Sequence, residues 1–96
     1  MRNIVYTDGA KYVADHASAY WLLDEIALTQ LTINSLRDTS FQVWKLIVHA
    51  DQTAKLICED GNERMLFSKN LTYTDFPLDE ITFYFTEGVI LLPSEY

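Results

Sequence analysis

The sequence contains a single cysteine, Cys58, among 96 residues. A lone cysteine excludes a disulfide within the chain and is typical of a reducing compartment. The sequence also lacks any apolar run near the roughly 20 residues of a membrane span. Its first residues have neither the apolar stretch nor the small-residue cleavage site of a signal peptide. We therefore expect a cytoplasmic protein with no membrane contact.

Basic residues are scarce, and scarcest toward the C-terminus. Seven lysines and arginines stand against 14 acidic residues, which gives a net charge of -7. Residues 51–96 hold nine of the acids and only three bases, and no base follows Lys69. Such a chain repels phosphate and is attracted to basic surfaces. We therefore expect no direct binding of nucleic acid.

Apolar residues are abundant enough for a packed core. They make up 49% of the chain, and 14% of all residues are aromatic, so we predict one folded domain over residues 1–96. Apolar positions recur at helical spacing over residues 8–33, after a short edge strand at 4–6 and a cap at Thr7 or Asp8. One helix of this length overshoots so small a domain, so we expect a kink or break at 16–18, with Ser18 as the new N-cap. The sequence leaves open one kinked helix or two helices, at 10–16 and 19–32.

Strand-like patterns fill the second half of the chain. Residues 41–48 are rich in β-branched and aromatic types, with Trp44, Leu46 and Val48 on one face, and predict an interior strand. Further strands are predicted at 54–59, 64–68, 81–86 and 89–92, after a polar linker at 34–40. The sequence leaves open whether the strand that begins at 64 ends at 68 or continues to 73. The sequence therefore predicts an α+β fold, with N-terminal helices packed on one face of a four- to five-stranded antiparallel β-meander at 41–92.

No catalytic or metal-binding motif stands out. Cys58 with His16 or His49 is the one nucleophile option, and the adjacent Glu59 raises a thiol pKa, the wrong direction for a thiolate. Asp51 can orient His49, yet no third member is visible. The acids at 59–63 surround a glycine turn but lack the ligand spacing of a calcium loop. We predict no enzymatic activity, no metal and no cofactor.

Several short motifs resemble a known group of proteins. They are Tyr6–Gly9, Ala19–Leu22, Phe41–Trp44, Cys58–Asn62, Tyr73–Leu78 and Leu92–Tyr96. Over nearly its whole length the chain resembles a family of small bacterial proteins of unknown function that are common on phages, plasmids and other mobile elements. The resemblance implies no catalytic residues. It implies a mobile-element setting, in which small acidic proteins often block host defences, anti-CRISPR proteins among them.

The acid-rich second half is the remaining feature. Same-face residues of a strand lie about 6.6–6.8 Å apart, close to two phosphate steps of about 3.4 Å. Carboxylates at the sheet rims can therefore take phosphate-like positions on a basic groove, although a charge of this size is also ordinary for solubility alone. The hypothesis is a non-enzymatic, DNA-mimicking inhibitor of a basic nucleic-acid-binding host protein, such as a CRISPR effector subunit. Its predicted partner-binding residues are Asp75, Asp79, Glu80, Glu87 and Glu95, with Glu59, Asp60 and Glu63 as a second cluster.

Two alternatives remain open. The first is a structural or dimerisation module that uses a sheet edge or the face around Trp21, as a monomer or weak dimer. For Trp21 itself we favour a place at the rim of the core over a partner-binding anchor. The second alternative is an enzyme built around Cys58 and a histidine.

Overall fold

The computed structural model describes residues 4–33, 36 and 38–96, so residues 34, 35 and 37 of the expected linker lie outside it. Within these ranges, no helix has the length and apolarity that crossing a membrane requires. The elements, in chain order, are β1 (Val5–Tyr6), α1 (Asp8–Ala17), α2 (Tyr20–Thr32), β2 (Phe41–Val48), β3 (Ala54–Glu59), β4 (Met65–Leu71), β5 (Glu80–Thr86), β6 (Val89–Leu91) and the short 3-10 helix η1 (Pro93–Glu95).

The helical region divides into two helices. Thr7 caps α1, because its hydroxyl accepts a hydrogen bond from the Ala10 N–H at 3.2 Å. Ser18 ends α1 in the left-handed conformation, with φ at 52°. The predicted role of Ser18 as the N-cap of the second helix is therefore wrong. Ala19 occupies that position, with no side-chain hydrogen bond to the helix.

The sheet has more strands than predicted, and its strands are arranged in a different order. Its order is β1-β6-β5-β2-β3-β4, six strands in all, and β1 runs parallel to β6. The predicted purely antiparallel, four- to five-stranded meander is therefore wrong, although the α+β class holds. The reason is that β2 is buried or half-buried along its whole length and takes an interior place, so β5 pairs with β2 rather than with β4. Residues 72–79 carry the chain from β4 past the ends of β3 and β2.

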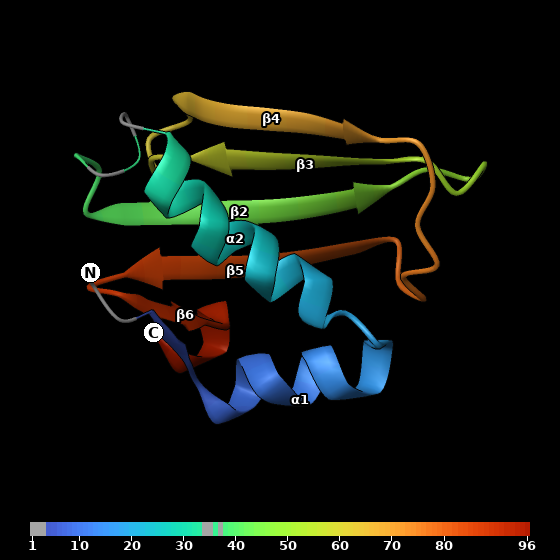
Figure 1. The fold of residues 1–96 in the computed structure, drawn as a ribbon, viewed down its shortest axis with the longest axis horizontal. Helices are drawn as coiled ribbons and strands as arrows, with labels where there is room; N and C mark the ends of the chain where they lie inside the picture. The colour runs from blue at the N-terminus through green and yellow to red at the C-terminus, as the bar shows by residue number, and fades with distance from the viewer. Residues whose placement is uncertain (1–3, 34–35, 37) are drawn as a thin grey trace.

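The helices and the sheet form two layers around one core. Figure 1 shows α2 crossing one face of the sheet and α1 lying beside β6. The predicted inward residues Trp44, Leu46 and Phe83 are buried there. Leu22 and Ile26 of α2 complete the same cluster. The opposite face of the sheet is covered by neither α1 nor α2 and holds the half-buried odd-numbered side chains of β2. The C-terminal Tyr96, directly after η1, packs there against Phe41, with ring centroids 5.3 Å apart.

One buried polar residue interrupts the apolar side of β2. Gln42 has no exposed surface, and its side-chain oxygen accepts hydrogen bonds from the Gln30 amide at 2.7 Å and the Trp44 indole at 2.9 Å. Its side-chain N–H groups donate to the Gln30 side-chain oxygen at 2.9 Å and to the Leu36 carbonyl at 3.0 Å. These bonds fasten the C-terminal end of α2 to the centre of the sheet.

Candidate functional site

Three of the predicted acids gather at one end of the sheet. Asp75 and Asp79 lie in the connection between β4 and β5, Glu80 is the first residue of β5, and all three are exposed. The turn between β2 and β3 lies beside them, because the Thr74 N–H donates to the Gln52 carbonyl and the Val48 N–H to the Asp79 carbonyl, both at 2.8 Å. Figure 1 shows both loops at the same end of the molecule.

That turn adds a fourth acid, Asp51, whose sequence position suggests only a partner of His49. Asp51 is exposed, and its carboxylate accepts hydrogen bonds from the Thr53 N–H at 3.1 Å and the Thr53 hydroxyl at 2.6 Å. These bonds lower the pKa of Asp51 below its ordinary value, so the group is charged at neutral pH. We call Asp51, Asp75, Asp79 and Glu80 the acidic end.

The connection is held in place by a buried anchor. Phe76 is 3% exposed, and its N–H donates to the Thr74 hydroxyl at 3.2 Å. Thr74 is itself buried, so the chain alternates between inward and outward side chains at this point. The outward positions go to Asp75 and, after Pro77, to Leu78 and Asp79. A fixed backbone here keeps the carboxylates turned to solvent.

A small hollow of about 290 Å³ adjoins the acidic end. It is lined by Trp21, Leu71, Tyr73, Thr74 and Asp75. Trp21 is half-buried and packs against the core, as predicted for a residue at the core rim. Tyr73 is 69% exposed. Tryptophan and tyrosine are the side chains most often found at the energetic centres of protein interfaces.

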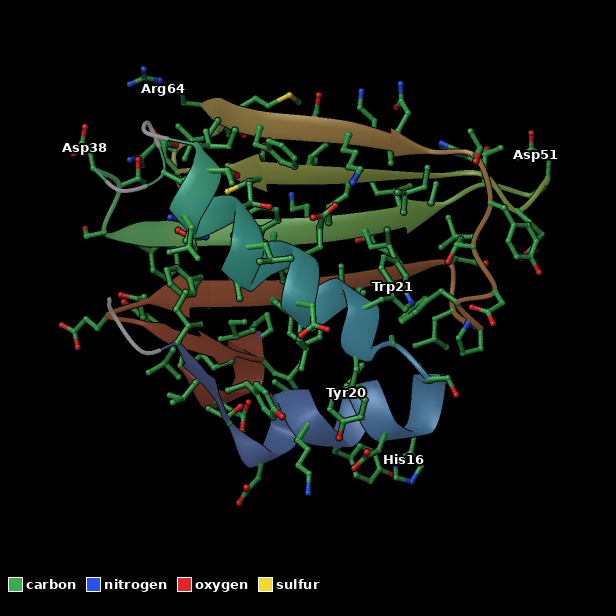
Figure 2. All side chains as sticks on the ribbon, in the orientation of Figure 1. His16, Tyr20, Trp21, Asp38, Asp51 and Arg64 are labelled. Atoms are coloured by element: carbon green, nitrogen blue, oxygen red, sulfur yellow. The ribbon has the colours of Figure 1, made fainter. Side chains whose placement is uncertain are left out.

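The other predicted acids lie elsewhere. Glu87 sits in the β5–β6 turn, seven strand steps from Glu80, a separation of about 23 Å. The turn after β3, with Asp60 and Glu63, is also at that far end, as the labelled Arg64 shows, while Asp51 marks the acidic end (Figure 2). Glu59 pairs with Lys45 at 3.0 Å. Of the first predicted cluster, Glu87 therefore lies far from Asp75, Asp79 and Glu80, at the end of the sheet that also holds the second cluster.

Besides Glu59, two more of those acids are engaged within the chain. One Asp60 oxygen accepts hydrogen bonds from the N–H groups of Asn62 at 2.8 Å and Arg64 at 3.2 Å, which shapes the β3–β4 turn. Glu95 accepts from the Thr7 hydroxyl, from the Leu92 N–H at 2.8 Å and from the Gly9 N–H at 3.1 Å. These bonds lower the pKa of Glu95 and tie η1 to the first turn of α1. Its carboxylate therefore has a stabilising role in the fold.

The residues weighed for catalysis are spread over the fold. Cys58 is fully buried in β3, and burial, with Glu59 and Asp60 nearby, raises its pKa to about 12. A thiol with such a pKa is protonated at neutral pH and is a poor nucleophile. His16 lies on α1, stacked on Tyr12 with ring centroids 3.9 Å apart, and its Nδ1 is 2.9 Å from the Tyr12 carbonyl (Figure 2). His49 is exposed at the end of β2.

Comparison with known proteins places the chain in one group. The model of a family of unknown function, DUF6876, matches residues 1–96. No curated protein and no solved structure matches the chain. The match agrees with the resemblance to a family of unknown function over nearly the whole sequence.

Proposed function

The chain belongs to this family of unknown function, and from its surface we propose that it is a non-enzymatic acidic binding protein. Its target is the basic, nucleic-acid-contacting surface of another protein. The observation that carries the proposal is the acidic end. Four carboxylates lie at this end of the sheet, on the β2–β3 turn, on the β4–β5 connection and at the start of β5, beside a hollow lined by Trp21 and Tyr73. The two features together offer a basic partner both charge attraction and aromatic anchors.

The charges at this site are available to a partner. Asp75, Asp79 and Glu80 are exposed, whereas Glu59, Asp60 and Glu95 are engaged within the chain. Arginine and lysine side chains also pack favourably on tryptophan and tyrosine rings. A surface of this kind competes with nucleic acid for the same basic groove. In a mobile-element setting, a CRISPR effector subunit is one such target, and the protein then acts as its inhibitor.

The test compares two variants of equal charge. The acidic-end variant carries Asp75→Asn, Asp79→Asn and Glu80→Gln. The control variant carries Asp8→Asn, Asp15→Asn and Glu63→Gln, three exposed acids outside the acidic end. Each tagged protein captures partners from a lysate of its native host at low salt and at 1 M salt. A captured basic protein is then identified, purified and titrated.

The proposal predicts that the acidic-end variant loses most of its association rate, while the control variant loses little. Salt should have the same effect, since the Debye length falls from about 10 Å at 0.1 M to about 3 Å at 1 M. Excess nucleic acid should displace the protein from its partner. Binding that is insensitive to salt, or that leaves nucleic-acid loading of the partner unchanged, would refute the proposal.

One observation favours a second candidate, a dimerisation module. Among the described strands, β4 lies at an edge of the sheet and pairs only with β3 over seven residues. An edge strand presents backbone groups that can pair with another chain. Sedimentation equilibrium between 10 µM and 1 mM decides this point, because a protein that stays monomeric throughout excludes dimerisation as its role.

A further inference from the structure

The outward side of α2 exposes two leucines and carries little charge for a surface helix. The exposed positions of α2 are Tyr20, Asp24, Leu28, Leu31 and Thr32, which share one side of the helix by their spacing. Leu28 is 58% exposed and Tyr20 is 37% exposed, and Asp24 is the one charged residue of the set. The inward side is apolar as well, with Leu22, Leu23 and Ile26 in the core. Exposed leucines on a helix whose other side is already buried are typical of a surface that a further element covers.

A second hollow opens at the C-terminal end of this helix. Its volume is about 490 Å³, within the range of about 300–1,000 Å³ for ligand sites. Leu31 of α2, Leu36 and Phe85 supply apolar walls, and the exposed acids Asp38 and Glu87 stand among its lining residues. Leu28 precedes Leu31 by three residues and therefore lies next to it on the helix surface. The exposed side of α2 thus leads into a hollow with an apolar interior and two carboxylates.

We propose that a basic amphipathic helix of a partner protein docks along α2. Its apolar side covers Leu28, and one of its lysine or arginine side chains enters the second hollow between Asp38 and Glu87. The length of the segment follows from α2 itself, whose 13 residues extend over about 20 Å. A partner helix of about 13 residues spans the same distance, from the second hollow to the hollow beside Trp21 at the acidic end. Recognition of this kind, an amphipathic helix on an apolar surface, is a recurrent mode of binding.

The negative charge of the chain favours a basic partner helix over a second copy of the chain as the occupant of this site. Each chain carries -7, and two copies that met through α2 would bring Asp24, Asp38 and Glu87 of both into one interface. Like charges placed together in an interface cost binding energy. The lysine and arginine side chains of a basic segment are instead attracted to these carboxylates. This inference shares one premise with the proposed function, namely that the partner is positively charged. Its other premises are the exposed side of α2 and the second hollow.

The test uses a synthetic peptide of 14 residues with leucine on one helical face and lysine on the other. A scrambled peptide of the same composition, with no apolar face, controls for charge alone. Binding is followed by amide NMR shifts of the full-length protein and by titration calorimetry. The matched variants are Leu28→Gln and Met65→Gln, since the two side chains are 58% and 52% exposed. Both positions are on the surface, so both variants should fold.

The expected result is a set of NMR shifts that includes Leu28, Leu31 and Gly88, with much weaker binding of the scrambled peptide. Leu28→Gln should weaken the amphipathic peptide at least fivefold, and Met65→Gln less than twofold. Asp38→Asn with Glu87→Gln should weaken it and reduce its salt dependence. Equal binding of the scrambled peptide, an unchanged affinity of Leu28→Gln, or no binding at 1 mM would overturn the inference. Self-association abolished by Leu28→Gln would assign this side of α2 to a second copy and would overturn it too.

The two proposals fail separately. Loss of peptide binding in Leu28→Gln, with full partner binding in the Asp75, Asp79 and Glu80 variant, supports the helix site and refutes the acidic end. The reverse pair of results refutes the helix site and supports the acidic end.

Discussion

Replacement of Gln42 by leucine should destabilise this protein severely, although leucine is close in size and suits a buried strand. Gln42 is fully buried in β2, and its amide holds hydrogen bonds to Gln30 at 2.7 and 2.9 Å. It also accepts the indole N–H of Trp44 at 2.9 Å. The leucine side chain fills much of the space but leaves these polar groups of Gln30 and Trp44 without the bonds that Gln42 supplies.

The magnitude follows from the groups that lose a partner. A buried polar group left without a hydrogen bond costs about 1–3 kcal/mol. Counting the Trp44 indole alone gives a loss of about 1–3 kcal/mol, and the loss of the two hydrogen bonds between Gln42 and Gln30 adds to it. A domain of this length has a total stability of about 5–14 kcal/mol, at about 0.05–0.15 kcal/mol per residue. Gln42→Leu should therefore remove a large part of the free energy of unfolding.

Urea denaturation followed by tryptophan fluorescence measures this loss. The double variant Gln30→Leu with Gln42→Leu is the informative comparison, because it removes both amides at once and leaves fewer unsatisfied groups. It should be more stable than the sum of the two single variants implies, by about 0.5–3 kcal/mol. A Gln42→Leu protein within about 1 kcal/mol of wild type, or strictly additive single effects, would refute the reasoning.

Three further predictions concern the core, the Glu95 contacts and the cysteine. Phe83→Ala should cost about 3–5 kcal/mol in the same denaturation assay, because Phe83 is buried at the centre of the core; an unchanged midpoint would contradict this. Because the pKa of Glu95 is lower in the folded protein, its contribution is complete above its ordinary value of 4.5 and is lost as pH falls through the folded pKa. Wild type should therefore lose more stability than Glu95→Gln between pH 5 and pH 3, and parallel pH profiles would count against the role of Glu95. Cys58→Ser should lower the melting temperature through the buried hydroxyl while partner binding persists, and a folded variant without binding would favour a chemical role for the thiol.

Some features of the site can be predicted from the sequence, and others cannot. The exposure of Asp75 and Asp79 follows from their place in a proline-containing connection between strands, and that of Glu80 from its place at the start of β5. Their convergence with Asp51 does not, because it requires β5 to lie beside β2 and the connection to pass the β2–β3 turn. In the sequence, Glu95 is as available to a partner as the other acids. In the fold it accepts hydrogen bonds from Thr7 and Gly9, which are more than 80 positions away, and from its neighbour Leu92.

The sequence by itself determined the local structure: a helical region with an interruption near residues 16–18, strands at nearly the predicted places, and the inward side of β2 with Trp44 and Leu46. These features depend on the periodicity of apolar residues and on turn residues, both of which can be recognised in short stretches of the chain. Only the tertiary structure decided the parallel pairing of β1 with β6, the partnership of Gln30 with Gln42, and the division of the acids between two ends of the sheet. Each of these depends on which distant segments become neighbours. That choice is made by the packing of the whole core, because no single segment can bury its apolar face alone.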